Sequence, residues 1–139
     1  MNDDEARIEE VQPSHFAKPK GYANGIIARG RTLHVAGQIG WRPDGRFETD
    51  DFVGQFAQAL DNVLDVVRAA GGKATDVVKM TVYVTDLDAY RESRAVLGEV
   101  WRTRMGRHYP AMALLQVAGL LEPRALVEIE AVACLPEEP

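Results

Sequence analysis

The sequence lacks several features that mark large classes of protein. Its 139 residues include one cysteine, Cys134, so no disulfide can form within the chain and a reducing compartment fits. No run of about 18 apolar residues occurs, so we expect no transmembrane helix and no membrane partner. The N-terminal stretch MNDDEARIEE is acidic and lacks the basic segment and apolar centre of a signal peptide. We therefore expect a cytoplasmic protein.

Positive charge is also scarce. Lysine and arginine total 16 against 21 aspartates and glutamates, which gives a formal net charge of −5. A general binder of nucleic acid needs a basic surface to neutralise phosphates. The composition therefore predicts no nucleic-acid partner.

Motifs for cofactors are missing as well. The stretch AAGGKAT contains Gly-Lys, but Ala74 stands where a phosphate-binding loop requires Ser or Thr, and the first glycine of that motif is absent. Neither GxGxxG nor GxSxG occurs. The histidines at positions 15, 34 and 108 are scattered, and Cys134 has no nearby partner, so we expect no metal site and no cofactor.

What is present describes one globular domain. The length fits a single domain, and 46% hydrophobic with 27% charged residues is an ordinary composition for one. Residues 1–20 are polar and contain two prolines, which predicts a loose, flexible lead-in. We expect the folded domain to span residues 21–136.

Two helices are predicted from apolar residues at a spacing of 3.6. The first runs from Phe52 to Ala70, begins at a cap chosen from residues 49–51, and ends at Gly71-Gly72. The second runs from Leu87 to Met105, and Arg94 interrupts its apolar stripe. Arg94 has two interpretations: its guanidinium extends to solvent, or it lines a ligand pocket.

The strands complete an order of ββαβαββ. GYANGIIARGRTLHVAGQIGW predicts two short strands around a turn, where Gly30 supplies the positive φ of a tight hairpin. Further strands are expected at 76–86, 111–117 and 125–135. The order predicts an α+β fold in which a mixed sheet carries both helices on one face. The other face would stay uncovered, and alternate apolar residues of 111–117 predict that it forms an oligomer interface.

The last strand carries two carboxylates in an otherwise apolar stretch, ALVEIEAVACL. Glu128 and Glu130 are two positions apart, so they project from the same face of a strand. Carboxylates among apolar neighbours require a cationic partner or take a raised pKa, and both outcomes are frequent at functional sites. The alternative is that both are solvated or form ordinary salt bridges.

At this point several stretches resemble one family. GY at 21–22, VAGQIG at 35–40, ALDNVLDVVRAAGG at 59–72, DVVKMTVYVTDLDAY at 76–90 and ALVEIEAVA at 125–133 are similar, in this order and spacing, to the RidA (YjgF) family. The resemblance covers about residues 20–136. It implies a chorismate-mutase-like α+β fold and a homotrimer whose sheets form a central β-barrel. It also implies small-ligand sites in the clefts between subunits.

The resemblance further implies a chemistry. The archetype hydrolyses enamines and imines such as 2-aminoacrylate without a cofactor; an arginine binds the substrate carboxylate and a glutamate positions or activates water. Glu128 matches that glutamate, which leaves Glu130 a structural or interface role. Tyr22 and Gly37 match pocket positions, although Gly37 also fits a simple β-bulge.

The pocket positions also contain departures from the family. Met112 stands where the archetype has its carboxylate-binding arginine, and Ala113 and Leu114 follow where small polar residues are usual. Ala36 replaces a serine, and Arg94 aligns with an asparagine. The sequence therefore predicts a pocket that is less polar on one wall and gains a cation on another.

Three functions remain open at this stage. The first is a hydrolytic deaminase of imines or enamines whose substrate is altered because of Met112. The second is a non-catalytic trimer that binds a small ligand or has a regulatory role. The third, a ribonuclease or translation inhibitor, is disfavoured by the acidic composition.

Overall fold

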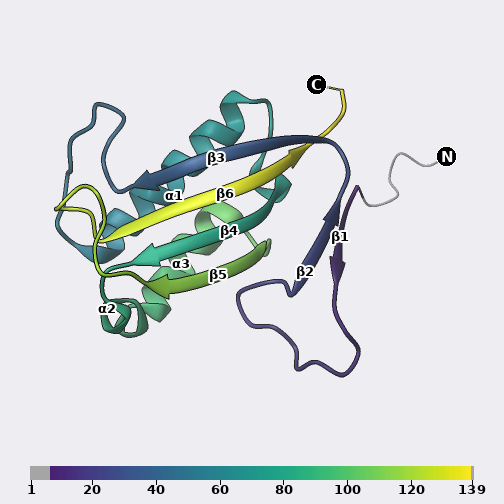
Figure 1. Cartoon of the computed structure of the whole chain (residues 1–139), viewed down its shortest axis with the longest axis horizontal. Helices are drawn as coiled ribbons and strands as arrows, with labels where there is room; N and C mark the ends of the chain where they lie inside the picture. The colour runs from purple at the N-terminus through teal and green to yellow at the C-terminus, as the bar shows by residue number, and fades with distance from the viewer. Residues whose placement is uncertain (1–6, 139) are drawn as a thin grey trace.

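The computed structural model describes residues 7–138 and confirms the α+β class (Figure 1). A short 3₁₀ turn at Ala74–Asp76 precedes β4. The helices and strands, in chain order, are β1 (Ile8–Val11), β2 (Gly25–Ala28), β3 (Arg31–Ile39), α1 (Phe52–Ala69), β4 (Val77–Val84), α2 (Leu87–Glu92), α3 (Arg94–Met105), β5 (Ala111–Gln116) and β6 (Val127–Leu135). No helix in the described residues is long and apolar enough to cross a bilayer.

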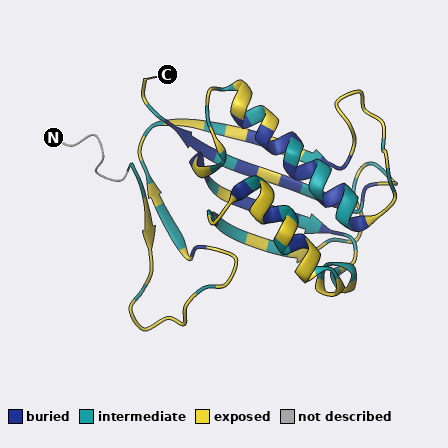
Figure 2. Ribbon diagram, turned by 180° about the vertical axis from the view of Figure 1, so that it is seen from behind, coloured by how far each residue is buried: buried dark blue, intermediate teal, exposed yellow. Residues whose placement is uncertain are grey.

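The main sheet has four strands in the order β3-β6-β4-β5. β6 pairs antiparallel with β3 and β4, whereas β4 and β5 are parallel and joined by the helical crossover, so the predicted mixed sheet is confirmed. Figure 2 shows α1 and α3 side by side on one face of this sheet, and Figure 1 shows the other face without helices. The helices therefore divide the sheet into a helix side and an open side.

Alternation along β6 and β4 builds the core on the helix side. Val127 and Ile129 of β6, and Met80 and Val82 of β4, are completely buried, while the residues between them are more exposed. They pack with the apolar stripe of α1, which includes Leu60. The same alternation places Glu128, Glu130, Lys79, Thr81 and Tyr83 on the open side. The open side is therefore more polar than the apolar residues of 111–117 had predicted.

The start of α1 is set by a cap within the predicted residues 49–51 and by a buried glutamine that the sequence analysis did not indicate. Asp51 caps it by accepting a 2.9 Å hydrogen bond from the backbone N–H of Gly54. In the first turn, the amide of the buried Gln55 donates to the backbone oxygens of Thr49 and Arg124, and its oxygen accepts from the N–H of Leu126. Gln55 therefore ties the start of α1 to the segment that leads into β6.

The predicted hairpin around Gly30 is wrong. β2 pairs with β1 in a separate two-stranded sheet, and β3 pairs with β6. Gly30 does have a positive φ of 145°, and a Cβ at this position would lie 1.9 Å from the backbone oxygen of Leu135, so only glycine fits. The close approach to β6, rather than a hairpin turn, explains this glycine.

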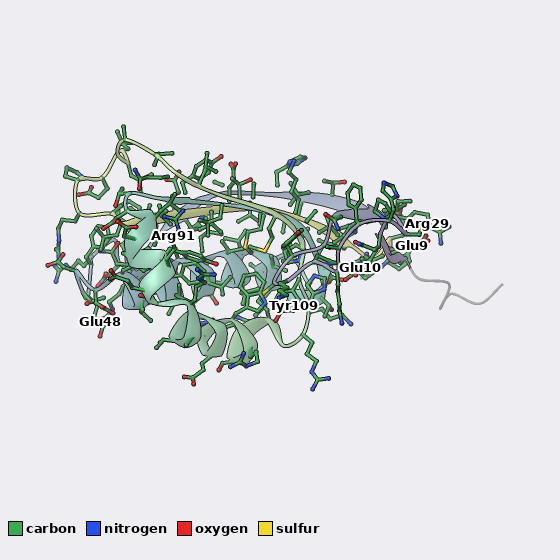
Figure 3. All side chains as sticks on the ribbon, turned by 90° about the horizontal axis from the view of Figure 1, so that it is seen from below. Glu9, Glu10, Arg29, Glu48, Arg91 and Tyr109 are labelled. Atoms are coloured by element: carbon green, nitrogen blue, oxygen red, sulfur yellow. The ribbon has the colours of Figure 1, made fainter. Side chains whose placement is uncertain are left out.

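Residues 8–11, which the sequence analysis assigned to a loose lead-in, form β1, while residues 1–6 lie outside the described part. Arg7 anchors this strand: its guanidinium is 2.6 Å from a carboxylate oxygen of Asp76 and 2.6 Å from the backbone oxygen of Cys134. The other oxygen of the buried Asp76 accepts from the N–H of Lys73. Figure 3 shows Glu9, Glu10 and Arg29 on the resulting arm, at the opposite end of the molecule from Glu48 and Arg91.

The predicted second helix is two helices. The N–H of Ser93 bonds to the backbone oxygen of Tyr90, three residues earlier, which tightens the turn and ends α2. α3 begins at the next residue, Arg94. The described residues therefore form three α-helices instead of two, and Arg94 starts a new helix.

Candidate functional site

Three of the predicted pocket residues meet on the helix side. Arg94, Met112 and Leu114 line one cavity of about 190 Å³ between α3 and β5. Because β5 alternates, Met112 and Leu114 face α3, whereas Ala113 is exposed on the open side. The cavity therefore gathers part of the predicted site and leaves Ala113 outside it.

The inner walls of this cavity are apolar and aromatic. Buried Phe56, Leu97 and Trp101 line it together with Tyr109 (labelled in Figure 3). The rings of Trp101 and Tyr109 are stacked in parallel, with centroids 5.8 Å apart. The indole N–H of Trp101 donates to the backbone oxygen of His108 at 3.1 Å. The hydrogen bond and the ring stack hold this wall in place.

Among the residues that the structure describes, Arg94 is the only arginine or lysine in the lining of this cavity. Its side chain is exposed, and none of the ion pairs within residues 7–138 includes it. Two other arginines of the same helical region are paired, Arg91 with Asp88 and Arg104 with Asp61. The guanidinium of Arg94 is thus available to an anion from outside the described chain.

The carboxylate pair lies on the open side of β6. The hydroxyl of Tyr83 donates a 2.6 Å hydrogen bond to Glu130, and this bond, reinforced by desolvation and the negative charges of both glutamates, raises the pKa of Tyr83. Tyr83 also stands directly opposite Glu128 in the β4–β6 register. The partner of Glu130 is therefore a phenol, which is not among the alternatives that the sequence analysis left open for this carboxylate.

Gly37 packs against Glu128. A Cβ at position 37 would lie 2.8 Å from the Cδ of Glu128, so a larger residue would displace this carboxylate. The β3–β6 register also shifts between Val35 and Gln38, which makes this stretch a β-bulge. The bulge brings the backbone of Gly37 against the carboxylate of Glu128, while the role of Gly37 in a ligand pocket stays a prediction. Ala36, within the bulge, is exposed.

Tyr22 lies just before β2 and is 41% exposed. Its neighbours connect it to the helix-side cavity: Gly21 lines the cavity, and the N–H of Ala23 donates to the backbone oxygen of Pro110 at the start of β5. The segment carrying Tyr22 thus runs along the outer edge of β5, where the cavity lies.

The predicted residues therefore form two separate groups. The helix-side pocket contains Arg94, Met112 and Leu114 with Tyr22 nearby, and the open side carries Glu128 with Gly37. The sheet separates these groups within one chain. No group of three or more His, Cys, Asp and Glu side chains in residues 7–138 is arranged to hold a metal ion.

Sequence reasoning missed two contributors, Tyr83 and Gly98. Tyr83 alternates with buried valines in β4, but its contact with Glu130 depends on the pairing of β4 with β6. Gly98 lines the cavity from the middle of α3, where a glycine is unusual. The sequence alone could have indicated Gly98, because a glycine inside a predicted helix is unusual.

Comparisons with known proteins place the chain in a family. A family model described as Endoribonuclease L-PSP matches residues 13–135. A RutC family protein of Pyrococcus horikoshii is 35% identical over 126 residues, which cover 90% of this chain and 96% of that protein. The 2-iminobutanoate/2-iminopropanoate deaminase of Escherichia coli is 37% identical over 113 residues, covering 81% and 85%.

A solved structure supports the same assignment. YyfB of Yersinia pestis, described as a protein of unknown function of the conserved Rid family, is 30% identical. It superimposes with a TM-score of 0.81 over 93% of this chain and 99% of its own. The chain therefore belongs to the Endoribonuclease L-PSP family, the Rid (RidA/YjgF) family that its motifs resemble.

Proposed function

We propose that this protein hydrolyses an imine or enamine at a site completed between two copies of the chain. The observation that carries the proposal is the division of the predicted site: a pocket on the helix side of one copy and a carboxylate on the open side of another supply its two halves. A relative that is 37% identical is a 2-iminobutanoate/2-iminopropanoate deaminase, which supports the reaction class.

In this reaction water adds to the carbon of the C=N bond. A new C–O bond forms and both hydrogens of the water pass to the nitrogen. The C–N bond then breaks, so that nitrogen leaves as ammonia while the carbon becomes a carbonyl. Glu128 serves as the base that orients the water and accepts its proton. Gly37 keeps the approach to that carboxylate free, and Ala36 and Tyr22 border the cleft. The reaction uses no cofactor.

The assembly that joins the halves is a homotrimer, with the open sides of the sheets around a central β-barrel. The open side carries the exposed Leu115, and no helix covers this side of the sheet in the single chain (Figure 1). We expect light scattering after size exclusion to give three times the chain mass of 15.3 kDa. A monomer mass at micromolar concentration would contradict the trimer.

A non-catalytic, ligand-binding trimer is the second candidate function. The observation that favours it is Met112, because a thioether can neither donate a hydrogen bond nor neutralise a carboxylate. A ribonuclease function rests on the family's name alone, and the acidic composition disfavours it.

The test is ammonia release from a panel of imines generated in the assay by an amino-acid oxidase. We expect the protein to accelerate hydrolysis of at least one imine above the rate in buffer, and boiled protein is the control. If no imine is hydrolysed faster while a panel compound still raises the melting temperature, the chain is a binder and the deaminase proposal fails.

A further inference from the structure

We propose that the helix-side pocket selects substrates with an aromatic side chain and a carboxylate: a phenyl-sized group fills the cavity and the carboxylate pairs with Arg94. This inference rests on the proposed function for its reaction, but its binding step stands alone. It names the substrate class of a 2-imino acid with an aryl group.

The size and lining of the cavity point to an aromatic group. Apolar cavities of about 150 Å³ bind benzene, and this one measures about 190 Å³. Its inner walls are Phe56, Leu97, Trp101 and Met112, all apolar. Aromatic and thioether groups make favourable contacts with a planar ring in edge or offset geometry. A short substrate such as 2-aminoacrylate would leave most of this surface uncovered.

The charge pattern points to a carboxylate. Among residues 7–138, no aspartate or glutamate lines the cavity, so an anion meets no repulsion from these walls. Arg94 is the one charged side chain there and has no ion-pair partner within residues 7–138. A guanidinium offers parallel N–H groups that match a carboxylate.

Gly98 explains how both parts of such a ligand fit. It lies one turn after Arg94 on the same face of α3, and both residues line the cavity. Its φ is not positive, so the backbone does not require glycine there. A Cβ would meet only the end of the flexible Arg102 side chain, at 3.3 Å. The glycine therefore weakens the helix although the backbone conformation does not require it. Space for a ligand in the pocket accounts for the glycine instead.

Isothermal titration with 3-phenylpropanoate tests the binding step without any turnover. We expect propanoate, which lacks the ring, to bind about 10- to 100-fold more weakly. We expect 3-phenylpropanamide, which lacks the charge, to bind about three- to tenfold more weakly, and we expect added salt to remove that difference. Equal affinities for the three compounds would overturn the inference.

Variants locate the binding to this pocket. Arg94→Gln should lose the preference for the acid over the amide, whereas Arg91→Gln, whose residue pairs with Asp88 outside the cavity, should keep it. Gly98→Leu should weaken 3-phenylpropanoate binding at least tenfold, because a helical side chain leans toward the preceding turn and would cover the space beside Arg94. Gly98→Ala is the smaller alternative and should melt at a higher temperature than the natural protein. Unchanged binding in Gly98→Leu and Gly98→Ala would exclude this cavity.

The binding assay and the hydrolysis assay can each refute one proposal without refuting the other. Tight binding of 3-phenylpropanoate without hydrolysis of any imine removes the deaminase proposal and leaves the ligand class. Hydrolysis of short aliphatic imines without selective binding of 3-phenylpropanoate removes the ligand class and leaves the deaminase. Faster hydrolysis of the imine of phenylalanine than of the imine of alanine, with the same order of affinities, supports both.

Discussion

This protein should accelerate hydrolysis of 2-aminoacrylate at least about 100-fold less than a relative with the family arginine. Met112 lines the helix-side pocket and packs with apolar neighbours. The resemblance to the family predicts that it stands in place of that arginine. A carboxylate brought against this wall loses water without gaining a partner, which costs several kcal/mol, and about 1.4 kcal/mol corresponds to tenfold in rate. Arg94 stands on another wall, and 2-aminoacrylate is too short to fill the cavity between them.

The assay generates 2-aminoacrylate with a serine dehydratase and follows pyruvate formation with and without the protein. Met112→Arg should gain activity on this substrate, and Met112→Gln, of similar length but neutral, should not. Circular dichroism checks that both variants are folded, because position 112 packs against the core. Natural protein that matches an arginine-bearing relative would contradict this explanation of the pocket.

The second large effect is expected from the carboxylate pair. Glu128→Gln should lower the rate on whichever imine the protein hydrolyses by about 100- to 10,000-fold, the usual contribution of general acid–base catalysis. Glutamine keeps the shape of the side chain beside Gly37 but removes its charge and basicity. The loss should appear in kcat rather than in KM, because the proposed mechanism has the carboxylate act on water and not on the bound substrate.

Glu130→Gln is the matched control, since it makes the same change two residues away on the same strand. Its carboxylate already accepts the hydroxyl hydrogen bond of Tyr83, and an amide oxygen can accept it as well, so we expect the rate to fall less than about tenfold. Tyr83→Phe removes that bond from the other side and should likewise leave most of the activity. A large loss in Glu130→Gln with full activity in Glu128→Gln would reverse the assignment of the two glutamates.

Several elements were predictable because their signals are local. The period of α1, its cap at Asp51 and its end before Gly71 are all contained in one continuous stretch. The alternation of β4 and β6 likewise separated buried from exposed positions, and it placed Glu128 and Glu130 on one face. The break at Ser93 was not predicted, because a tightened turn leaves the apolar stripe on both sides nearly unchanged.

The sequence did not predict which strands pair with each other or which side chains from distant segments form contacts. The turn at Gly30 was predicted to be a hairpin because a tight hairpin needs a residue with a positive φ. The glycine is instead required because the backbone of Leu135, more than 100 positions away, lies against it. The phenol of Tyr83 became the partner of Glu130 only through the register of β4 on β6. Such pairings depend on hydrogen bonds and burial between distant segments.

The sequence by itself determined the fold class, the first helix, the strand faces and the family, because periodicity, capping and motif order are properties of neighbouring residues. The tertiary structure alone decided that Met112 and Leu114 meet Arg94 on one side of the sheet while Glu128 and Gly37 lie on the other. Strand order and register, which are set by burial of the helix-facing core, determine which residues of distant segments share a face. That long-range pairing divides the predicted site between the two sides of one chain.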